Sequence, residues 1–330
     1  MDRTLKGIVM KTVTISLAIM FFLVLVWPAQ SQPYPNKPIR IIVPFPAGDA
    51  ADTLARLVGQ KLAERLGQQV IVDNRAGAAG QLGLDLAAHA APDGYTITLG
   101  QGGNLVVAPH TYKKLAYDPI KDFAPVALLV ANGLVLAVHP SAPFRNAQDL
   151  ISYAKANPGK LTFASNGEGA FVHLAFELLR LQAGFTYLHV PYKSGVGGLV
   201  DLVGGQVDSS MTTLSTIAPF ARSGKLRLLG TTNPKRLAQF ADVPTIAETV
   251  PGYELRGWFG LLAPAAAPRE VVVLLNQEIN RAMELSDVRE KVIASGWDID
   301  TGPPEHFVTT LRNDYAKFGK LVRDIGFQPQ

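Results

Sequence analysis

Apolar and polar residues alternate in two different ways from residue 38 onward, which predicts strands followed by helices. The β-branched run 39–43 predicts a buried strand, and the leucine spacing over 54–62 predicts one face of a helix. Prolines separate the two patterns, so a tight loop joins them. Asp49 stands at the expected N-cap, with Asp52 three residues later. The first N–H groups of this helix therefore lie behind a glycine-containing loop, which makes a suitable anion site.

The same succession of strand, loop and helix recurs in the next stretch of the chain. Strands are predicted at 69–72 and 95–99, and each ends in a loop rich in glycine. Between them we expect a helix with Leu82, Leu86 and Ala90 on its buried face. Because strands that alternate with helices form parallel sheets, ligands are expected at the carboxyl ends of these strands, where the loops lie.

Two apolar segments predict connections between two lobes. Residues 125–138 are almost continuously apolar, which is long for one strand, and residues 258–264 mirror them. Further strands are predicted between these segments at 161–164, 187–190, 206–211 and 226–231, the last as a parallel strand. The expected organisation is lobe 1 over residues 32–131 and 265–330 and lobe 2 over residues 132–264, with a cleft between them that closes by a hinge.

Residues 1–31 are predicted to be a secretory signal peptide. Three basic residues precede the apolar segment Ile15–Trp27, and Ala29-Gln30-Ser31 has the small-x-small pattern of a cleavage site. A membrane anchor is the alternative, but the apolar segment is shorter than the ~20 residues that a spanning helix needs. We therefore expect an exported protein.

Composition narrows the possible chemistry. The 330 residues include no cysteine, which excludes disulfides, a thiol nucleophile and a cysteine-bound metal. Hydrophobic residues make up 48% and charged residues 18%, as is typical of α/β proteins. Without residues 1–31, the 31 basic and 27 acidic residues of the chain reduce to a net charge of +2, and the basic residues are scattered. No nucleic-acid binding is expected.

The common catalytic and nucleotide-binding motifs do not occur in the sequence. The glycines of the loop 77–83 are spaced as GxxGxxG, which is not the dinucleotide fingerprint, and GxxxxGK[ST], GxSxG and HExxH are absent. His173 is either a structural histidine or a catalytic base. Asp49 and Asp52 are either helix caps or catalytic acids, and Trp258 belongs either to the core or to a ligand platform. We favour the first interpretation of each.

Several short motifs occur in one order over nearly the whole mature chain. They are Pro44-Phe45-Pro46-Ala47-Gly48 with Asp52, Asn74 to Gly80, Asp93-Gly94-Tyr95, Ala164 to Gly169 with His173-Leu174, His189 to Lys193, Val243-Pro244-Thr245 with Glu248, and Trp258 with Ala263-Pro264. In this order and at these intervals, the motifs resemble the Bug-type periplasmic solute-binding proteins of the tripartite tricarboxylate transporter family.

The resemblance implies an α/β fold of the type II periplasmic-binding-protein class, with two α/β lobes joined by two crossover strands around a ligand cleft. It implies a periplasmic receptor that is no enzyme, holds no cofactor or metal, and binds a small carboxylate. The receptor then delivers this ligand to the membrane permease subunits of a tripartite transporter. We expect a monomer. The alternatives are a chemosensory or signalling receptor for the same ligands, and an enzyme that uses the same cleft.

The ligand-binding residues that the resemblance implies lie mostly in two loops that precede helices. They are Phe45, Pro46, Ala47, Gly48, Asp49, Asp52, Gly77, Gly80, Ser165, Asn166, Gly167, Gly169, Ala170, His173, Gly195, Thr212 and Thr213. The Ser165 hydroxyl is expected to donate to the ligand. Asp49, Ala170 and Ser194 depart from the family's usual glycine, hydroxyl residue and glycine. Because an acid near an anion site is unfavourable unless it caps the helix or meets a cation, a zwitterion, an aromatic monocarboxylate or an amide are alternatives to a dicarboxylate.

Overall fold

The computed structural model describes residues 34–192 and 195–329. Residues 37–330 form one compact unit. The predicted signal peptide, residues 1–31, lies outside the described residues, as does Ser194. Within the described part of the chain, no helix has the length and apolar character needed to span a bilayer.

One sheet is built on β1 (Ile39–Val43), which lies between two parallel neighbours. β2 (Val70–Asn74) and β3 (Thr96–Gln101) pair with β1, and β9 (Arg256–Pro264) continues the sheet antiparallel to β3. β1 is buried almost throughout, as its β-branched run predicts. The helices associated with this sheet are α2 (Ala50–Leu66), α3 (Gln81–Ala88), α9 (Arg269–Met283), α10 (Ser286–Ala294) and α11 (Pro304–Asp324), and η1 (Ala78–Gly80), η2 (Gly103–Val107) and α4 (Ala108–Thr111) are short connecting segments.

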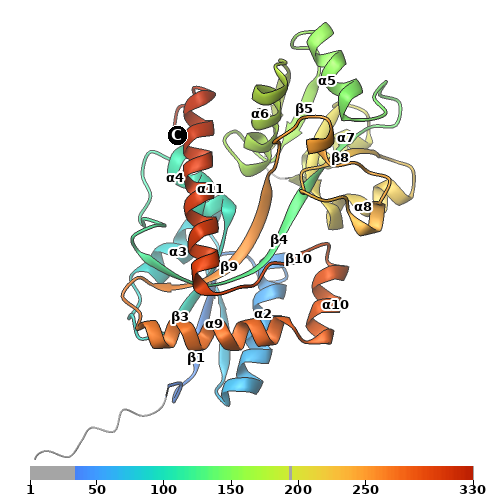
Figure 1. Ribbon diagram of the computed structural model, residues 1–330. Coiled ribbons are helices and arrows are strands. Elements are labelled where there is room, and N and C mark those ends of the chain that lie inside the picture. The colour runs from blue at the N-terminus through green and yellow to red at the C-terminus, as the bar shows by residue number, and fades with distance from the viewer. Residues whose placement is uncertain (1–33, 193–194, 330) are drawn as a thin grey trace, which may run out of the picture. The chain divides into compact units, whose positions relative to one another are not determined.

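The long strand β4 (Phe123–Val138) belongs to two sheets. Its residues 123–133 pair antiparallel with β9, and β10 (Asp298–Ile299) also pairs with this part of it. Its residues 134–138 pair with strands of the second sheet. In Figure 1, β4 and β9 run side by side from the first sheet toward the second. The predicted crossover is therefore one continuous strand, and the exact lobe boundaries stay a prediction.

The second sheet contains β5 (Thr162–Ser165), with β6 (Leu188–Pro191) and β7 (Ser209–Thr213) parallel on either side. β7 and β8 (Arg227–Thr231) both pair antiparallel with β4. The prediction of β8 as a parallel-paired strand is wrong, because its partner is the crossover strand. The remaining elements of this part are α5 (Ala147–Ala156), α6 (Phe171–Ala183), α7 (Gly195–Val203), α8 (Leu214–Arg222), η3 (Ala238–Phe240) and η4 (Ile246–Glu248).

Helix α3 buries a different face from the one predicted. Leu82 and Leu86 are 56% and 42% exposed, whereas Leu84 is fully buried. The reason is a close approach of the helix to the end of β1, where a Cβ at Gly83 would lie 2.8 Å from the Cβ of Pro44. Only glycine fits there, and this contact turns the leucines at 82 and 86 toward solvent.

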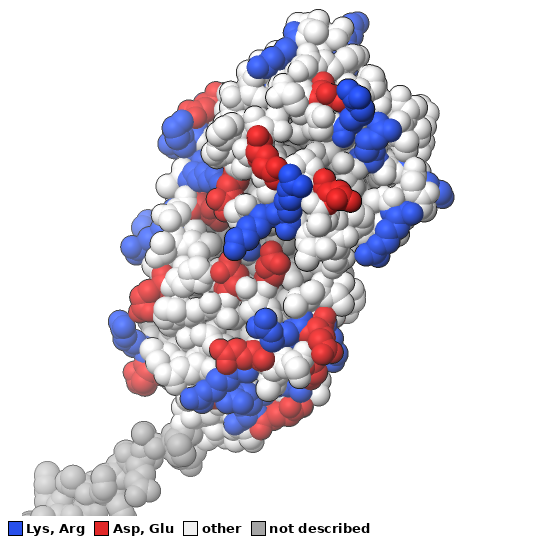
Figure 2. Space-filling view, turned by 45° about the vertical axis from the view of Figure 1, so that its right-hand side comes forward, with Lys and Arg blue, Asp and Glu red and all other residues white. Residues whose placement is uncertain are grey.

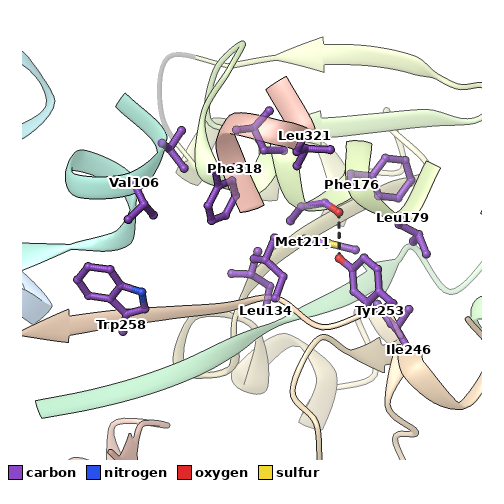
Figure 3. Close-up of a cluster of buried hydrophobic side chains, with 14 of the residues drawn as sticks. Val106, Leu134, Phe176, Leu179, Met211, Ile246, Tyr253, Trp258, Phe318 and Leu321 are labelled. Carbon is purple, nitrogen blue, oxygen red and sulfur yellow. Dashed lines mark hydrogen bonds between the residues drawn. The ribbon is translucent and has the colours of Figure 1, made fainter. Parts of the chain in front are cut away.

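The hydrophobic core is continuous between the two sheets. Figure 3 shows Phe318 of α11, Phe176 of α6 and Leu134 of β4 in one cluster of buried side chains. The hydroxyl of Tyr253, which is fully buried, donates to the backbone oxygen of Ala175 at 2.9 Å, so its polar atom has a partner. Through Phe318, helix α11 packs in the same cluster as α6, the helix that follows the second predicted ligand loop.

Charged residues of both signs share the surface. On the face in Figure 2, Lys and Arg side chains lie among Asp and Glu side chains and do not gather into one basic patch. This face offers none of the continuous positive charge that nucleic-acid binding requires.

Candidate functional site

The first predicted ligand loop, residues 44–49, is held in shape by Asp52. The carboxylate of Asp52 is 3% exposed and accepts hydrogen bonds from the Gly48 N–H at 2.8 Å, Arg56 Nε at 3.0 Å and Asn74 Nδ2 at 2.9 Å. Asn74 Nδ2 also donates to the backbone oxygen of Phe45 at 3.1 Å. Burial raises the pKa of Asp52, but these hydrogen bonds and the Arg56 charge outweigh it, so the pKa lies below its usual value. Asp52 is therefore an ionised support of the loop.

The start of helix α2 presents unused hydrogen-bond donors to solvent. Asp49 is the N-cap, as predicted, and its carboxylate accepts from the Ala51 N–H at 2.9 Å. The N–H groups of Ala47 and Ala50 have no acceptor among the described residues, and both residues are exposed. Gly48 adopts φ +84°, a backbone conformation that favours glycine. The loop thus carries exposed N–H groups at the positive end of a helix.

The second predicted loop, Ser165–Ala170, connects β5 to α6 and is organised around the Ser165 hydroxyl. Ser165 Oγ lies 2.7 Å from His189 Nε2 and 3.0 Å from the Gly167 oxygen, and it accepts from the Gly167 N–H at 3.2 Å. The single hydroxyl proton therefore goes to one of two partners within the protein. Ser165 is 3% exposed. The Ser165 hydroxyl supports the loop in this structure, and its donation to a ligand stays a prediction.

Two stacked histidines lie behind this loop. His173 Nδ1 accepts from the Gly169 N–H at 3.0 Å, and its ring lies 3.8 Å from the His189 ring with 1° between the planes. Burial, with the neighbouring His189, lowers the pKa of His173 to about 4, and burial also lowers the pKa of His189. Only a neutral His173 can accept at Nδ1. These contacts favour the structural interpretation of His173, which ties the loop to its own helix.

Helix α6 begins without a side-chain cap. The N-cap is Ala170, whose side chain cannot accept, and the N–H groups of Phe171 and Val172 have no acceptor among the described residues. α6 therefore presents free donors at its first turn, in the same way as α2.

Four of the predicted site residues line one cavity of about 220 Å³ at the carboxyl ends of β5 and β7. They are Ser165, Asn166, Thr212 and Thr213, with Val172 of α6 beside them. Thr213 Oγ1 lies 2.9 Å from Thr216 Oγ1, within the first turn of α8. The cavity occupies the place where ligands of parallel sheets bind.

The remaining predicted residues have mainly structural positions. Gly80 has φ +91°, and a Cβ at this position would lie 2.8 Å from Asn104 Nδ2. Glycine therefore allows Asn104 to approach the backbone closely. Gly169 packs against the ring of Phe327, which a Cβ would approach to 2.6 Å. Gly77 is the N-cap of η1, and Gly195 is the first residue of α7. None of these four glycines lines the 220 Å³ cavity.

Two residues of the quoted motifs that were not among the predicted site residues support the two ligand loops. Asn74 and His189 belong to the quoted motifs, but their roles depend on partners that only the fold brings close. Trp258 is 3% exposed and its Nε1 donates to Asp314 Oδ2 at 2.8 Å, so it belongs to the core. Over the described residues, no three His, Asp or Glu side chains are placed to hold a metal ion together.

A two-lobed α/β protein with free helix-start donors in loops of both sheets belongs to the class of solute-binding proteins. Residues 54–327 match the tripartite tricarboxylate transporter family receptor (TctC). Protein BugT of Bordetella pertussis is 34% identical over 91% of this chain and 92% of its own length. The chain therefore belongs to this receptor family, and the predicted fold class and receptor function are confirmed.

Solved structures of relatives carry ligands. The structure "R. palustris Rpa4515 with adipate" has a TM-score of 0.78 and 32% identity, covering 90% of this chain and 100% of that one. MatC from Rhodopseudomonas palustris with bound malate has a TM-score of 0.73 and 31% identity, covering 88% and 100%. Both relatives were solved with dicarboxylates, and receptors of this family are periplasmic.

Proposed function

We propose that this chain binds a small carboxylate between its two lobes and delivers it to the membrane permease subunits of a tripartite transporter. The observation that carries the proposal is the pair of helix starts, α2 and α6, each with unpaired N–H groups. The proposed site residues are those of the loops 45–52 and 165–173, with Thr212 and Thr213. Relatives solved with adipate and malate support a carboxylate as the ligand.

Electrostatics favour an anion at both helix starts. Backbone N–H groups and the helix dipole both attract negative charge, and hydrogen bonds to an ionised acceptor are stronger than neutral ones. The nearby acids do not oppose this, because Asp49 caps α2 and Asp52 is neutralised by Arg56 within the loop. Asp49, which departs from the family pattern, is therefore compatible with a dicarboxylate.

One contact favours an enzyme as the second candidate. Ser165 Oγ lies 2.7 Å from His189 Nε2, as in a nucleophile with its base. However, the hydroxyl also accepts from the Gly167 N–H, and no carboxylate among the described residues is hydrogen-bonded to His189. We propose binding without catalysis.

Export and assembly complete the proposal. Residues 1–31 are proposed as a cleaved signal peptide, the mature protein as a periplasmic monomer, and the lobes as residues 32–131 with 265–330 and residues 132–264. A receptor that works in transport, rather than in sensing, must be required for uptake. Deletion of the gene should abolish growth on the ligand as sole carbon source.

The test is a carboxylate panel, including adipate, malate, aromatic acids and amino acids, followed by thermal shift and calorimetry. A ligand at about 100 times its dissociation constant should stabilise the protein by roughly 2.7 kcal/mol. Mass spectrometry of the recovered ligand should find it unchanged. Failure of every carboxylate to bind, or turnover of a bound one, would overturn the proposal.

A further inference from the structure

Strand β4 passes from the first sheet to the second directly after Gly133. In the antiparallel register Gly133 lies opposite Arg256, so the Cβ positions of the two residues share one face of the sheet, about 5 Å apart. Asn233, which follows β8, occupies the place beside Gly133, where a Cβ would lie 2.6 Å from the Asn233 backbone N and 2.8 Å from Asn233 Oδ1. The amide group of Asn233 therefore stands where a side chain at position 133 would face Arg256.

Two polar atoms at this crossing lack a hydrogen-bond partner. Asn233 is 5% exposed, and its Oδ1 is buried with no donor among the described residues. Arg256 Nε is also buried and has no acceptor in the described part of the chain. Buried polar atoms are almost always hydrogen-bonded, because an unpaired one is destabilising. Since one atom is an acceptor and the other a donor, each can serve as the partner of the other.

The rest of the Arg256 guanidinium group is held from the side of the first sheet. Arg256 Nη1 lies 3.2 Å from Asp300 Oδ2, and Nη2 lies 3.7 Å from Asp298 Oδ2. Asp298 belongs to β10, which pairs with the part of β4 in the first sheet. Asn233 follows β8, which pairs with the part of β4 in the second sheet. A hydrogen bond from Arg256 Nε to Asn233 would thus connect both sheets through one side chain.

A cavity of about 420 Å³ leaves room for these groups to approach each other. It is lined by residues 233–239 after β8, by residues within 293–298 around the end of α10, and by Arg256. Trp297 lines this cavity and also one that reaches Gly48 in the first ligand loop. In Figure 1, α10 and β10 lie below α8 and β8. Movement of the segment 233–239 toward 293–298 therefore narrows the space on both sides of Trp297.

We propose that closure of the two lobes joins Arg256 Nε to Asn233 Oδ1, and that this hydrogen bond is a latch for the closed arrangement. The chain Asp300–Arg256–Asn233 then links the two sheets at the strand crossing. A ligand that binds the closed arrangement is held more tightly when that arrangement is more populated. Asn233 and Arg256 are thus positioning residues, which act on affinity through the lobes. This inference rests on the proposed function and identifies residues that regulate it.

Two variants each remove one side of the latch. Asn233→Leu replaces the acceptor with an apolar side chain of similar size, and Arg256→Lys keeps the positive charge near Asp300 but has no Nε–H. Each should weaken carboxylate binding about three- to tenfold. Asn233→Leu should have no further effect in the Arg256→Lys background, because the bond is lost only once. Lys235→Met, at an exposed position of the same cavity, is the matched control and should keep wild-type affinity.

Calorimetry gives these affinities for every carboxylate of the panel that binds, with malate and adipate tried first. NMR of the Arg256 Nε–H adds a readout that a merely structural role would not move. With saturating ligand, this proton should shift downfield in the wild type and stay in place in Asn233→Leu, whose folding is checked by urea unfolding.

The outcomes separate the latch from the proposed function. Wild-type affinity in Asn233→Leu, or effects of the two substitutions that multiply in the double variant, would overturn the latch and leave the proposed function standing. An Nε–H resonance of Arg256 that does not move with saturating ligand would do the same. Failure of every carboxylate to bind would overturn the proposed function and the latch with it.

Discussion

The substitution Asp52→Asn should loosen the first ligand loop without changing the volume of the side chain. Asp52 accepts from three donors, and the amide has one acceptor oxygen. In its best orientation, that oxygen faces Gly48 and Arg56, and the amide NH₂ then faces the donor of Asn74. The NH₂ group of Asn74 then faces another NH₂ group, which is repulsive. The Gly48 N–H and Arg56 keep an oxygen acceptor, but this oxygen no longer carries a negative charge.

The size of the effect follows from these partners. A hydrogen bond to a charged group contributes about 1.5–3 kcal/mol, against about 0.5–1.5 kcal/mol for a neutral one. The Arg56 side chain is 54% exposed, so solvent screens its ion pair, and most of the loss comes from the hydrogen bonds of Gly48 and Asn74. We expect the free energy of unfolding to fall by about 2 kcal/mol. Because the binding-competent loop becomes less populated, affinity for the carboxylate should fall about tenfold.

Urea unfolding gives the stability of the variant, and calorimetry gives its affinity. The matched control is Asp149→Asn, because Asp149 accepts from the Arg145 N–H and Nε at the start of α5, away from the site. This control should lose some stability and keep its affinity. If Asp52→Asn binds the carboxylate as tightly as the control does, the loop does not form the site.

Three further substitutions or conditions probe the second loop and the glycine of the first. Burial holds the pKa of His173 near 4, so the folded protein keeps this side chain neutral. The unfolded chain takes up a proton at His173 as the pH falls below about 6.5. The contribution of His173 to the free energy of unfolding is therefore fully present well above pH 6.5, and the free energy of unfolding should be lower by about 2 kcal/mol at pH 5. Urea titrations should show a shallower pH dependence in His173→Asn, and an unchanged slope would contradict the assignment. Gly169→Ala places a Cβ 2.6 Å from the Phe327 ring at φ +69°, which should cost about 2–4 kcal/mol in thermal unfolding. Phe327→Ala in the same chain should recover the part due to the clash, and no recovery would refute the contact. In Gly48→Val the added side chain meets open space, but the backbone at this position has φ +84°, which valine disfavours. The loop should therefore change shape, and calorimetry should show a carboxylate affinity about tenfold lower. An affinity equal to that of the wild type would show that the loop conformation is unimportant for binding.

The local features of the first strand, loop and helix could be predicted from the sequence. The change from a β-branched run to a helical leucine spacing is contained within residues 39–62, and the Asp49 cap depends only on residues next to it. The apolar run 125–138 identified the connection between the sheets for the same reason. Its length argued against a single strand, however, and β4 is one continuous strand.

Features that depend on distant partners could not be predicted in this way. The engagement of Ser165 by His189 joins residues 24 apart, and the direction of β8 is defined by its pairing with β4. The buried face of α3 depends on the contact of Gly83 with Pro44, which helical spacing does not contain. A cavity of about 770 Å³ is lined by residues of α2 and α10, helices from opposite ends of the chain.

The central claim is that backbone N–H groups at the starts of α2 and α6 hold the carboxylate. Backbone amide NMR during titration with the tightest carboxylate of the panel tests it most directly. The claim predicts the largest downfield proton shifts at Ala47, Ala50, Phe171 and Val172, because new hydrogen bonds to an anion deshield these protons. Unchanged amide resonances at all four positions with saturating ligand would contradict it.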